Sequence, residues 1–204
     1  MNKIYKIVLT GGPCAGKTSA LHVLKSYYED KGYIVLVVSE SATELISGGV
    51  SPKTYPVHQE YMYYQTRLQL EKELIFTSAA QTIVETLHKD VIVFFDRGIM
   101  DIKAYMKENE FYHMLSLFDI TEEKILNKYH LILHLETAAK MQKYVTENNS
   151  ARYETAAEAC ILDEKTFSSW SKHTNLVYIN VCKTFDEKTN ELTNQINALL
   201  DNTI

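Results

Sequence analysis

The sequence predicts an α/β fold in which helices cover both faces of a five-stranded parallel sheet. Five short apolar runs alternate with helical patterns along the chain, as expected of parallel strands joined by right-handed crossovers. The first run, residues 4–9, leads into a glycine-rich loop and then a helix, an order typical of phosphate-binding folds. The length of 204 residues suits one domain, which we expect to span residues 1–204.

The composition fits an ordinary globular protein and excludes several other classes. Hydrophobic residues make up 46% of the chain and charged residues 23%, which excludes collagen-like, disordered and membrane-spanning proteins. The formal net charge of −5 gives no basic field, so no nucleic-acid partner is expected. The chain begins with a core strand, and no stretch is long enough for a transmembrane segment. Together with three scattered cysteines, Cys14, Cys160 and Cys182, this predicts a cytoplasmic location.

The loop over residues 11–19 reads GGPCAGKTS and fills every fixed position of the phosphate-binding pattern G-x-x-x-x-G-K-[ST]. Glycine lets the backbone N–H groups of such a loop turn inward, and we expect all three glycines to be needed for this reason. Lys17 is predicted to contact the β- and γ-phosphates, and the Thr18 hydroxyl to hold Mg²⁺. The alternative is a turn without ligand. The residues predicted to bind nucleotide are Gly11, Gly12, Pro13, Cys14, Ala15, Gly16, Lys17, Thr18 and Ser19.

After a first helix over residues 18–31, a second strand over residues 33–38 ends just before Glu40. In an open parallel sheet the ligand lies beyond the carboxyl ends of the strands, so Glu40 shares a crevice with the phosphate-binding loop. Glu40 is therefore a candidate to orient or deprotonate an acceptor, and the alternative is a carboxylate that anchors a loop. Residues 41–56 carry two glycines and two prolines and predict a short helix followed by a mobile loop.

Residues 57–89 show helical spacing and predict one long helix that covers the sheet. The positions assigned to its buried face are Tyr61, Tyr64, Leu68, Ile75, Ala79, Ile83 and Leu87. Polar side chains of its early half are candidates to reach an acceptor, although at least two of them are expected to face solvent. These candidates are Gln65, Arg67, Gln69 and Glu71.

A third strand over residues 91–95 runs straight into Asp96 and Arg97. Four or more apolar residues that end in an aspartate are typical of a Walker B strand, whose carboxylate holds the Mg²⁺ shell. Asp96 is therefore the second predicted metal-binding residue beside Thr18, and a helix N-cap is the alternative. Arg97 is a permanent cation suited to bidentate contact with phosphate or an acceptor oxygen, so we predict a catalytic role for it.

The remaining predicted elements are two or three short helices within residues 98–128, strands over residues 129–136 and 175–181, and a closing helix over residues 184–200. His130 and His134 share a face of the fourth strand, but packing is favoured over metal binding because no carboxylate or cysteine joins them. Trp170 and His173 fit either a core or a pocket wall, and the sequence leaves both open.

Residues 137–163 contain a polar break and then Arg152, with which an alanine-rich helix is predicted to open. In small-molecule kinases this position in the fold is a lid, whose closure excludes water from the reacting phosphate. Arg152 is the predicted lid cation and a candidate catalytic residue. The alternative is an exposed arginine on an ordinary helical hairpin.

Four stretches together resemble one known family. They cover residues 9–19, 39–49, 95–106 and 151–180. The chain resembles the AAA-type P-loop family that groups ribosylnicotinamide-kinase-like domains of NAD-biosynthesis regulators with the TRPL translocation defect protein, a GTP- and phosphoinositide-binding protein. Its layout is also similar to that of deoxynucleoside and thymidylate kinases, where Glu40, Asp96 and Arg97 match a base and a metal- and acceptor-binding pair. The fold prediction is thus a nucleoside-kinase-like P-loop NTPase three-layer sandwich with strand order 2-3-1-4-5 and a lid.

These residues predict an enzyme that uses Mg²⁺ and transfers the γ-phosphoryl group of ATP or GTP to a hydroxyl of a nucleoside-like acceptor. Lys17, Arg97 and Arg152 would stabilise the transferred charge, and Glu40 would act on the acceptor. The alternative is a nucleotide-dependent switch that hydrolyses slowly and recruits a protein or lipid. The missing N/T-K-x-D motif favours ATP, whereas the resemblance to a GTP-binding protein favours GTP. The acceptor and a homodimer stay open.

Overall fold

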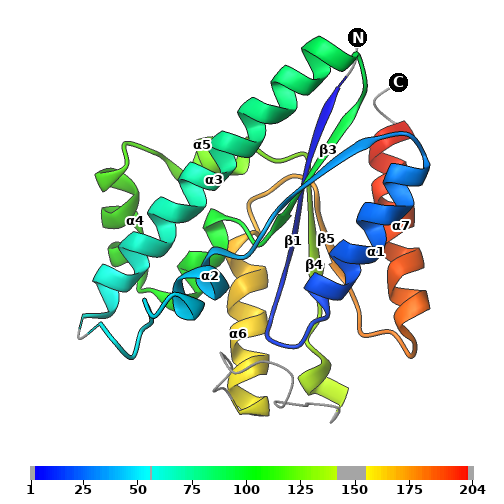
Figure 1. Cartoon of the computed structure of the whole chain (residues 1–204). Helices are drawn as coiled ribbons and strands as arrows, with labels where there is room; N and C mark the ends of the chain where they lie inside the picture. The colour runs from blue at the N-terminus through cyan, green and yellow to red at the C-terminus, as the bar shows by residue number, and fades with distance from the viewer. Residues whose placement is uncertain (1–2, 56, 142–154, 202–204) are drawn as a thin grey trace.

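The computed structural model describes residues 3–55, 57–141 and 155–201 of the chain. Its centre is one sheet of five parallel strands in the order β2-β3-β1-β4-β5 (Figure 1). The strands are β1 (Ile4–Gly11), β2 (Ile34–Val38), β3 (Val91–Asp96), β4 (Leu131–Leu135) and β5 (Leu176–Ile179). The predicted fold class and strand order are therefore confirmed. Within the described ranges, every helix is too short or too polar to cross a membrane.

Helices cover both faces of the sheet, which gives the predicted three layers (Figure 1). One layer consists of α1 (Lys17–Asp30) and α7 (Phe185–Asp201). The other is built on α3 (His58–Leu87) and α6 (Ala156–Ser169). Shorter helices complete the molecule: α2 (Ser41–Ser47), the 3₁₀ helix η1 (Ile99–Tyr105), α4 (Glu108–Leu117), α5 (Glu122–Leu126) and the 3₁₀ turn η2 (Ala138–Met141).

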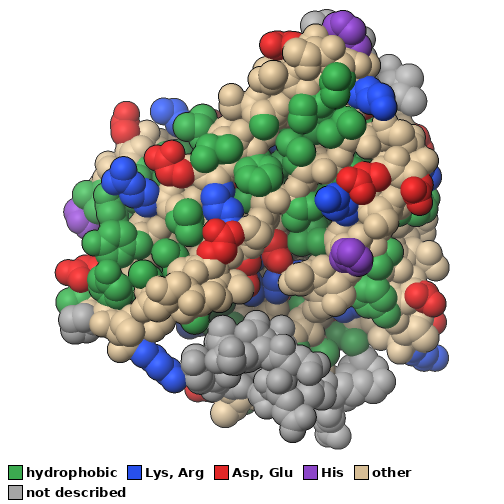
Figure 2. Space-filling model, viewed as in Figure 1, with side chains coloured by type: hydrophobic (Ala, Val, Ile, Leu, Met, Phe, Trp, Pro, Cys, Tyr) green, Lys and Arg blue, Asp and Glu red, His purple; other side chains and the backbone are tan. Residues whose placement is uncertain are grey.

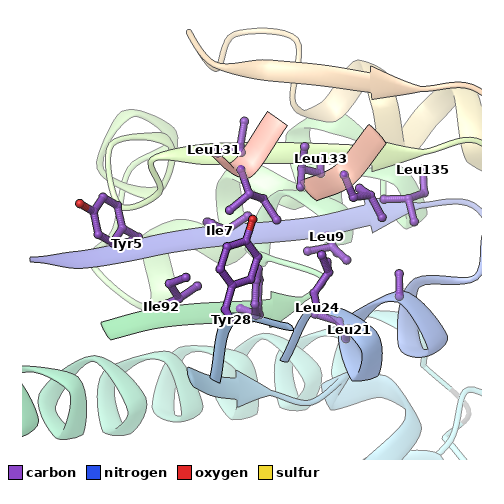
Figure 3. Close-up of a cluster of buried hydrophobic side chains, with 14 of the residues drawn as sticks. Tyr5, Ile7, Leu9, Leu21, Leu24, Tyr28, Ile92, Leu131, Leu133 and Leu135 are labelled. Atoms are coloured by element: carbon purple, nitrogen blue, oxygen red, sulfur yellow. The ribbon is translucent and has the colours of Figure 1, made fainter. Parts of the chain in front are cut away.

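The central strand β1 sends alternate side chains into the two layers. Ile7 and Leu9 pack on the α1 side, where Leu24 and Tyr28 are also fully buried (Figure 3). Val8 packs on the α3 side. A strand with both faces covered is apolar throughout, which is why β1 reads as a continuous hydrophobic run. This packing fixes the strand end from which the glycine-rich loop starts.

The long helix α3 is present, but its predicted buried face is mostly wrong. Of the assigned positions Tyr61 is buried and Ile83 packs partly buried against the core, whereas Ile75 and Leu87 are 60% and 57% exposed. Figure 2 shows hydrophobic side chains on the surface in the region of this helix. The side chains that are buried are Tyr61, Met62, Thr66, Gln69, Lys72, Glu73 and Ala80. Hydrogen bonds make these polar groups compatible with burial, as when Gln69 donates to Glu73 at 3.0 Å. Hydrophobic spacing cannot detect such a face.

Two or three short helices are predicted within residues 98–128, and the structure has three there, η1, α4 and α5. His134 is buried in β4 and stacks on Tyr178 at 5.2 Å between ring centroids, and Trp170 is a fully buried core residue. Searched over its described residues, the chain shows no cluster of three or more His, Cys, Asp or Glu that could hold a metal. Arg152 and much of the predicted lid fall within residues 142–154, outside the described residues.

Candidate functional site

The ends of β1 and β3 lie side by side at the carboxyl edge of the sheet. Their parallel register pairs Leu9 with Asp96, so Asp96 stands where the chain leaves β1 for the glycine-rich loop. The loop ends at Gly16, and α1 begins at Lys17. Ligands of open parallel sheets bind beyond this edge. The structure therefore brings the predicted phosphate-binding loop and the predicted metal-binding aspartate together.

The loop conformation agrees with the expected use of glycine at two of its three glycine positions. Gly11 has φ +136° and Gly16 has φ +81°, both in the region that favours glycine. The expectation for Gly12 is wrong, because its φ is not positive. A Cβ at Gly12 would instead lie 2.8 Å from Cβ of Asp163, so close packing against α6 requires glycine there. Cys14 also adopts a positive φ, 58°, although it lacks the conformational freedom of glycine.

The backbone of the loop accepts hydrogen bonds from two side chains that come later in the sequence. The Thr137 hydroxyl donates to the carbonyl of Pro13 at 2.5 Å, and Lys188 Nζ donates to the carbonyl of Ala15 at 2.9 Å. Thr18 and Ser19 are exposed on the first turn of α1. The carbonyls of Pro13 and Ala15 thus face the protein, an arrangement that leaves the N-terminus of α1 for an anion.

Lys17 is buried, and its ammonium group is hydrogen-bonded to the backbone of the loop. Its Nζ donates to the carbonyls of Gly11 at 3.1 Å and Gly12 at 3.0 Å. Burial, reinforced by the nearby Arg97 cation, lowers the pKa of Lys17 to about 8. The lysine is therefore charged at neutral pH but easily deprotonated, and an incoming phosphate would favour its charged form.

Thr18 and Asp96 meet at a place that suits Mg²⁺. The Thr18 hydroxyl donates to Oδ2 of Asp96 at 3.3 Å, whereas Oδ1 of Asp96 is buried and has no hydrogen-bond partner within the described part of the chain. Burial raises the pKa of the Asp96 carboxyl, and the Glu40 carboxylate adds to this effect. Mg²⁺ is commonly held by one or two protein oxygens together with substrate phosphates and water. An unpartnered carboxylate oxygen beside a hydroxyl fits that ion.

Glu40 and Arg97 form an ion pair across the ends of β2 and β3. Arg97 has φ 71°, an unusual value for a side chain of its size, and its Nε donates to Oε1 of Glu40. Its Nη1 donates to the carbonyl of Gly11 at 3.0 Å. Burial opposes ionisation of Glu40, but the Arg97 and Lys17 cations outweigh it and lower its pKa to about 2. Glu40 is thus a carboxylate at every physiological pH.

Asp101 is a site residue that sequence reasoning missed. It is buried, and its Oδ1 accepts from the Thr10 hydroxyl and from Nη1 of Arg97 at 3.3 Å. Its Oδ2 accepts from the Gly98 amide at 2.9 Å and from the Trp170 indole at 3.2 Å. Asp101 therefore fixes the position of Arg97. The four-residue spacing between the two was the one signal of this contact in the sequence.

Gln69 supports the same arginine from α3. Its amide nitrogen donates to the carbonyl of Arg97 at 3.4 Å, and its amide oxygen accepts from the Ser41 hydroxyl at 2.7 Å. Gln69 is buried, and its side chain contacts the backbone of Arg97 instead of solvent or an acceptor. The other three polar candidates on α3 are half-buried or exposed. The structure brings together four of the predicted site residues, Lys17, Glu40, Asp96 and Arg97. Arg152 lies outside the described residues.

The lowered pKa of Lys17 predicts that triphosphate affinity falls at alkaline pH. The free protein must hold Lys17 charged to bind a phosphate well, and with a pKa of about 8 it loses that charge as the pH rises through 8. Linkage then gives a fall in ATP affinity of about tenfold between pH 7 and pH 9. Calorimetric titration at several pH values checks this, and Lys17→Ala should show weak affinity with no such slope.

Comparison with models of known protein families gives a match over most of the chain. The model of a family described as AAA domain matches residues 6–188, which include the loop, Glu40, Asp96 and Arg97. No curated protein matches the chain.

Proposed function

Because the chain belongs to the AAA domain family and carries its P-loop nucleotide-binding domain, we propose that it is a kinase acting on a small molecule. It would transfer the γ-phosphoryl group of ATP or GTP to a hydroxyl of a nucleoside-like acceptor. The observation that carries this proposal is the Glu40–Arg97 pair, held at the sheet edge beside Lys17 and Asp96. A site that only bound nucleotide would need Lys17 and the metal-binding residues, but not a fixed carboxylate facing them.

Phosphoryl transfer requires positioned cations more than covalent chemistry, because charge spreads over the oxygens of the transferred group. Lys17 would leave the loop carbonyls and contact the β- and γ-phosphates. Arg97, kept in place by Glu40 and Asp101, would stabilise the charge that develops during transfer. Thr18 and Asp96 would hold Mg²⁺, which neutralises phosphate charge when bound.

Glu40 is negatively charged, as a general base must be, but it is only weakly basic. A carboxylate with a pKa of about 2 takes a proton poorly, so it would act mainly by accepting a hydrogen bond from the acceptor hydroxyl. In a loose transition state the hydroxyl loses its proton late, and orientation matters more than early deprotonation. The proposed role of Glu40 is therefore to aim the acceptor at the γ-phosphate.

Further parts of the proposal depend on residues or relations beyond the site. We expect the chain to form one domain over residues 1–204, with a lid near residues 137–163 that supplies Arg152. The resemblance to ribosylnicotinamide-kinase-like domains supports a nucleoside-like acceptor, and the resemblance to the TRPL translocation defect protein supports a nucleotide-dependent switch. Acceptor-dependent transfer separates these two functions.

The test is acceptor-dependent transfer by the wild-type chain and by Glu40→Gln. With Mg-ATP or Mg-GTP and a pool of nucleosides and vitamins, the wild type is expected to form a phosphorylated product. Glu40→Gln should lower transfer about 100-fold, the lower end of acid–base and orientation effects, with little change in nucleotide affinity. Glu71→Gln, exposed on α3, is the matched control and should behave as wild type. Slow hydrolysis that no acceptor accelerates would instead identify the switch.

A further inference from the structure

The peptide unit that joins Gly11 to Gly12 is held at both ends. Its carbonyl accepts from Nζ of Lys17 at 3.1 Å and from Nη1 of Arg97 at 3.0 Å. Its N–H donates to Oδ1 of Asp163 at 2.8 Å. The N–H and C=O groups of a trans peptide point in opposite directions, so fixing one of them fixes the other. The contact with Asp163 therefore determines that this carbonyl faces the two cations.

Asp163 is itself firmly placed. It lies buried on α6, and its Oδ1 also contacts Nε2 of His134 at 3.2 Å. Nδ1 of His134 is buried and has no hydrogen-bond partner within the described ranges, which suits a ring that donates to Asp163 from Nε2. Burial opposes ionisation of Asp163, but His134 and the Gly12 amide lower its pKa. Asp163 is therefore a carboxylate when it accepts from Gly12.

Packing alone does not account for a charged acceptor at this place. A carboxylate beside a loop that binds phosphate opposes anion binding by its charge. A charged acceptor, however, makes a stronger hydrogen bond than a neutral one and so resists rotation of the peptide. If this peptide rotated, the Gly11 carbonyl would leave Lys17 and Arg97.

We infer that Asp163 is a positioning residue for the phosphoryl-transfer site. It orients the Gly11–Gly12 peptide, whose carbonyl accepts from Lys17 in the free protein and keeps Arg97 in place when Lys17 moves to the triphosphate. This inference rests on the phosphate-binding part of the proposed function and needs no particular acceptor. It assigns to α6 a task that its sequence does not reveal.

The first experiment observes the hydrogen bond directly by NMR. Chains labelled with ¹³C at glycine carbonyls and ¹⁵N at glycine amides single out glycines that follow glycine, which are Gly12 and Gly49. In Asp163→Ala the Gly12 amide proton should move upfield, because it loses a charged acceptor. The Gly49 amide donates to the carbonyl of Ile46 and should not move. An unchanged Gly12 signal would overturn the inference, whatever the activity of the protein.

The second experiment separates positioning from general damage to the loop. Single-turnover cleavage of Mg-ATP and the dissociation constant of ATP are measured for wild type, Asp163→Ala and Asp163→Asn. Asp163→Ala should slow cleavage about tenfold or more, the effect of losing a hydrogen bond to a charged group, while ATP affinity changes less than about threefold. Asp163→Asn keeps an acceptor oxygen and should restore most of the rate. Glu164→Ala removes an exposed carboxylate one residue away and is the matched control.

The outcomes are distinct. Equal losses of rate and affinity, or no loss of either, would show that Asp163 does not position the cations. A wild-type chain that fails to bind triphosphate would contradict the proposed function instead, and the Gly12 signal would still decide whether Asp163 holds the peptide.

Discussion

Replacing Lys17 with alanine is expected to weaken ATP binding about 100-fold, since removing one partner of a desolvated charge pair costs about 2–5 kcal/mol. Lys17 is buried, and it is the one lysine or arginine among the predicted phosphate-binding residues 11–19. In the variant, the carbonyls of Gly11 and Gly12 would keep facing that site without a cation between them and the phosphates. Calorimetric titration with ATP at pH 7 measures the loss.

The control for this variant is Lys25→Ala, because Lys25 is an exposed lysine of the same helix, with 46% side-chain exposure. It should bind ATP as the wild type does. Equal affinity of the Lys17→Ala and Lys25→Ala chains would show that the loop is not where the phosphates bind.

The second large effect is expected for Arg97→Lys, which should slow phosphoryl transfer about 100-fold. The substitution removes a preorganised hydrogen-bond donor that would stabilise the charge developing during transfer. Lysine keeps a positive charge beside Glu40 and Asp101, so neither carboxylate is left buried without a cation. A single ammonium group cannot reproduce the planar fork of donors with which Arg97 contacts Glu40, Asp101 and the Gly11 carbonyl. Rates are compared at saturating ATP.

ATP affinity separates this role from a structural one. We expect it to change less than about fivefold in Arg97→Lys, because a contact made mainly in the transition state lowers the rate and not binding. Full activity of Arg97→Lys would remove Arg97 from the proposed mechanism. A parallel loss of affinity and melting temperature would make it a structural residue.

The sheet and the place of the site could be predicted because each depends on short-range patterns. Apolar runs that end in a glycine loop or an aspartate mark strands of a covered parallel sheet, and the strand order brings the ends of β1 and β3 together. Glu40 and Arg97 follow neighbouring strands, so their proximity was also predictable. Their ion pair is a consequence of that topology.

The rest could not be predicted because it depends on side chains far apart in sequence. Asp163 reaches Gly12 across 151 residues, and the Thr10 hydroxyl reaches Asp101 across 91 residues. No local spacing signals either contact. The buried face of α3 was missed for a related reason, since Gln69 and Lys72 are polar and become compatible with burial in part through partners on other elements.

The central claim is that a nucleoside triphosphate and its magnesium bind where the ends of β1 and β3 meet. A crystal structure of the chain with Mg²⁺ and a non-hydrolysable ATP analogue tests it most directly. The predicted result is a metal bound by the Thr18 hydroxyl next to Asp96, with the γ-phosphate between Lys17 and Arg97. A triphosphate bound elsewhere, with Lys17 still on the carbonyls of Gly11 and Gly12, would contradict it.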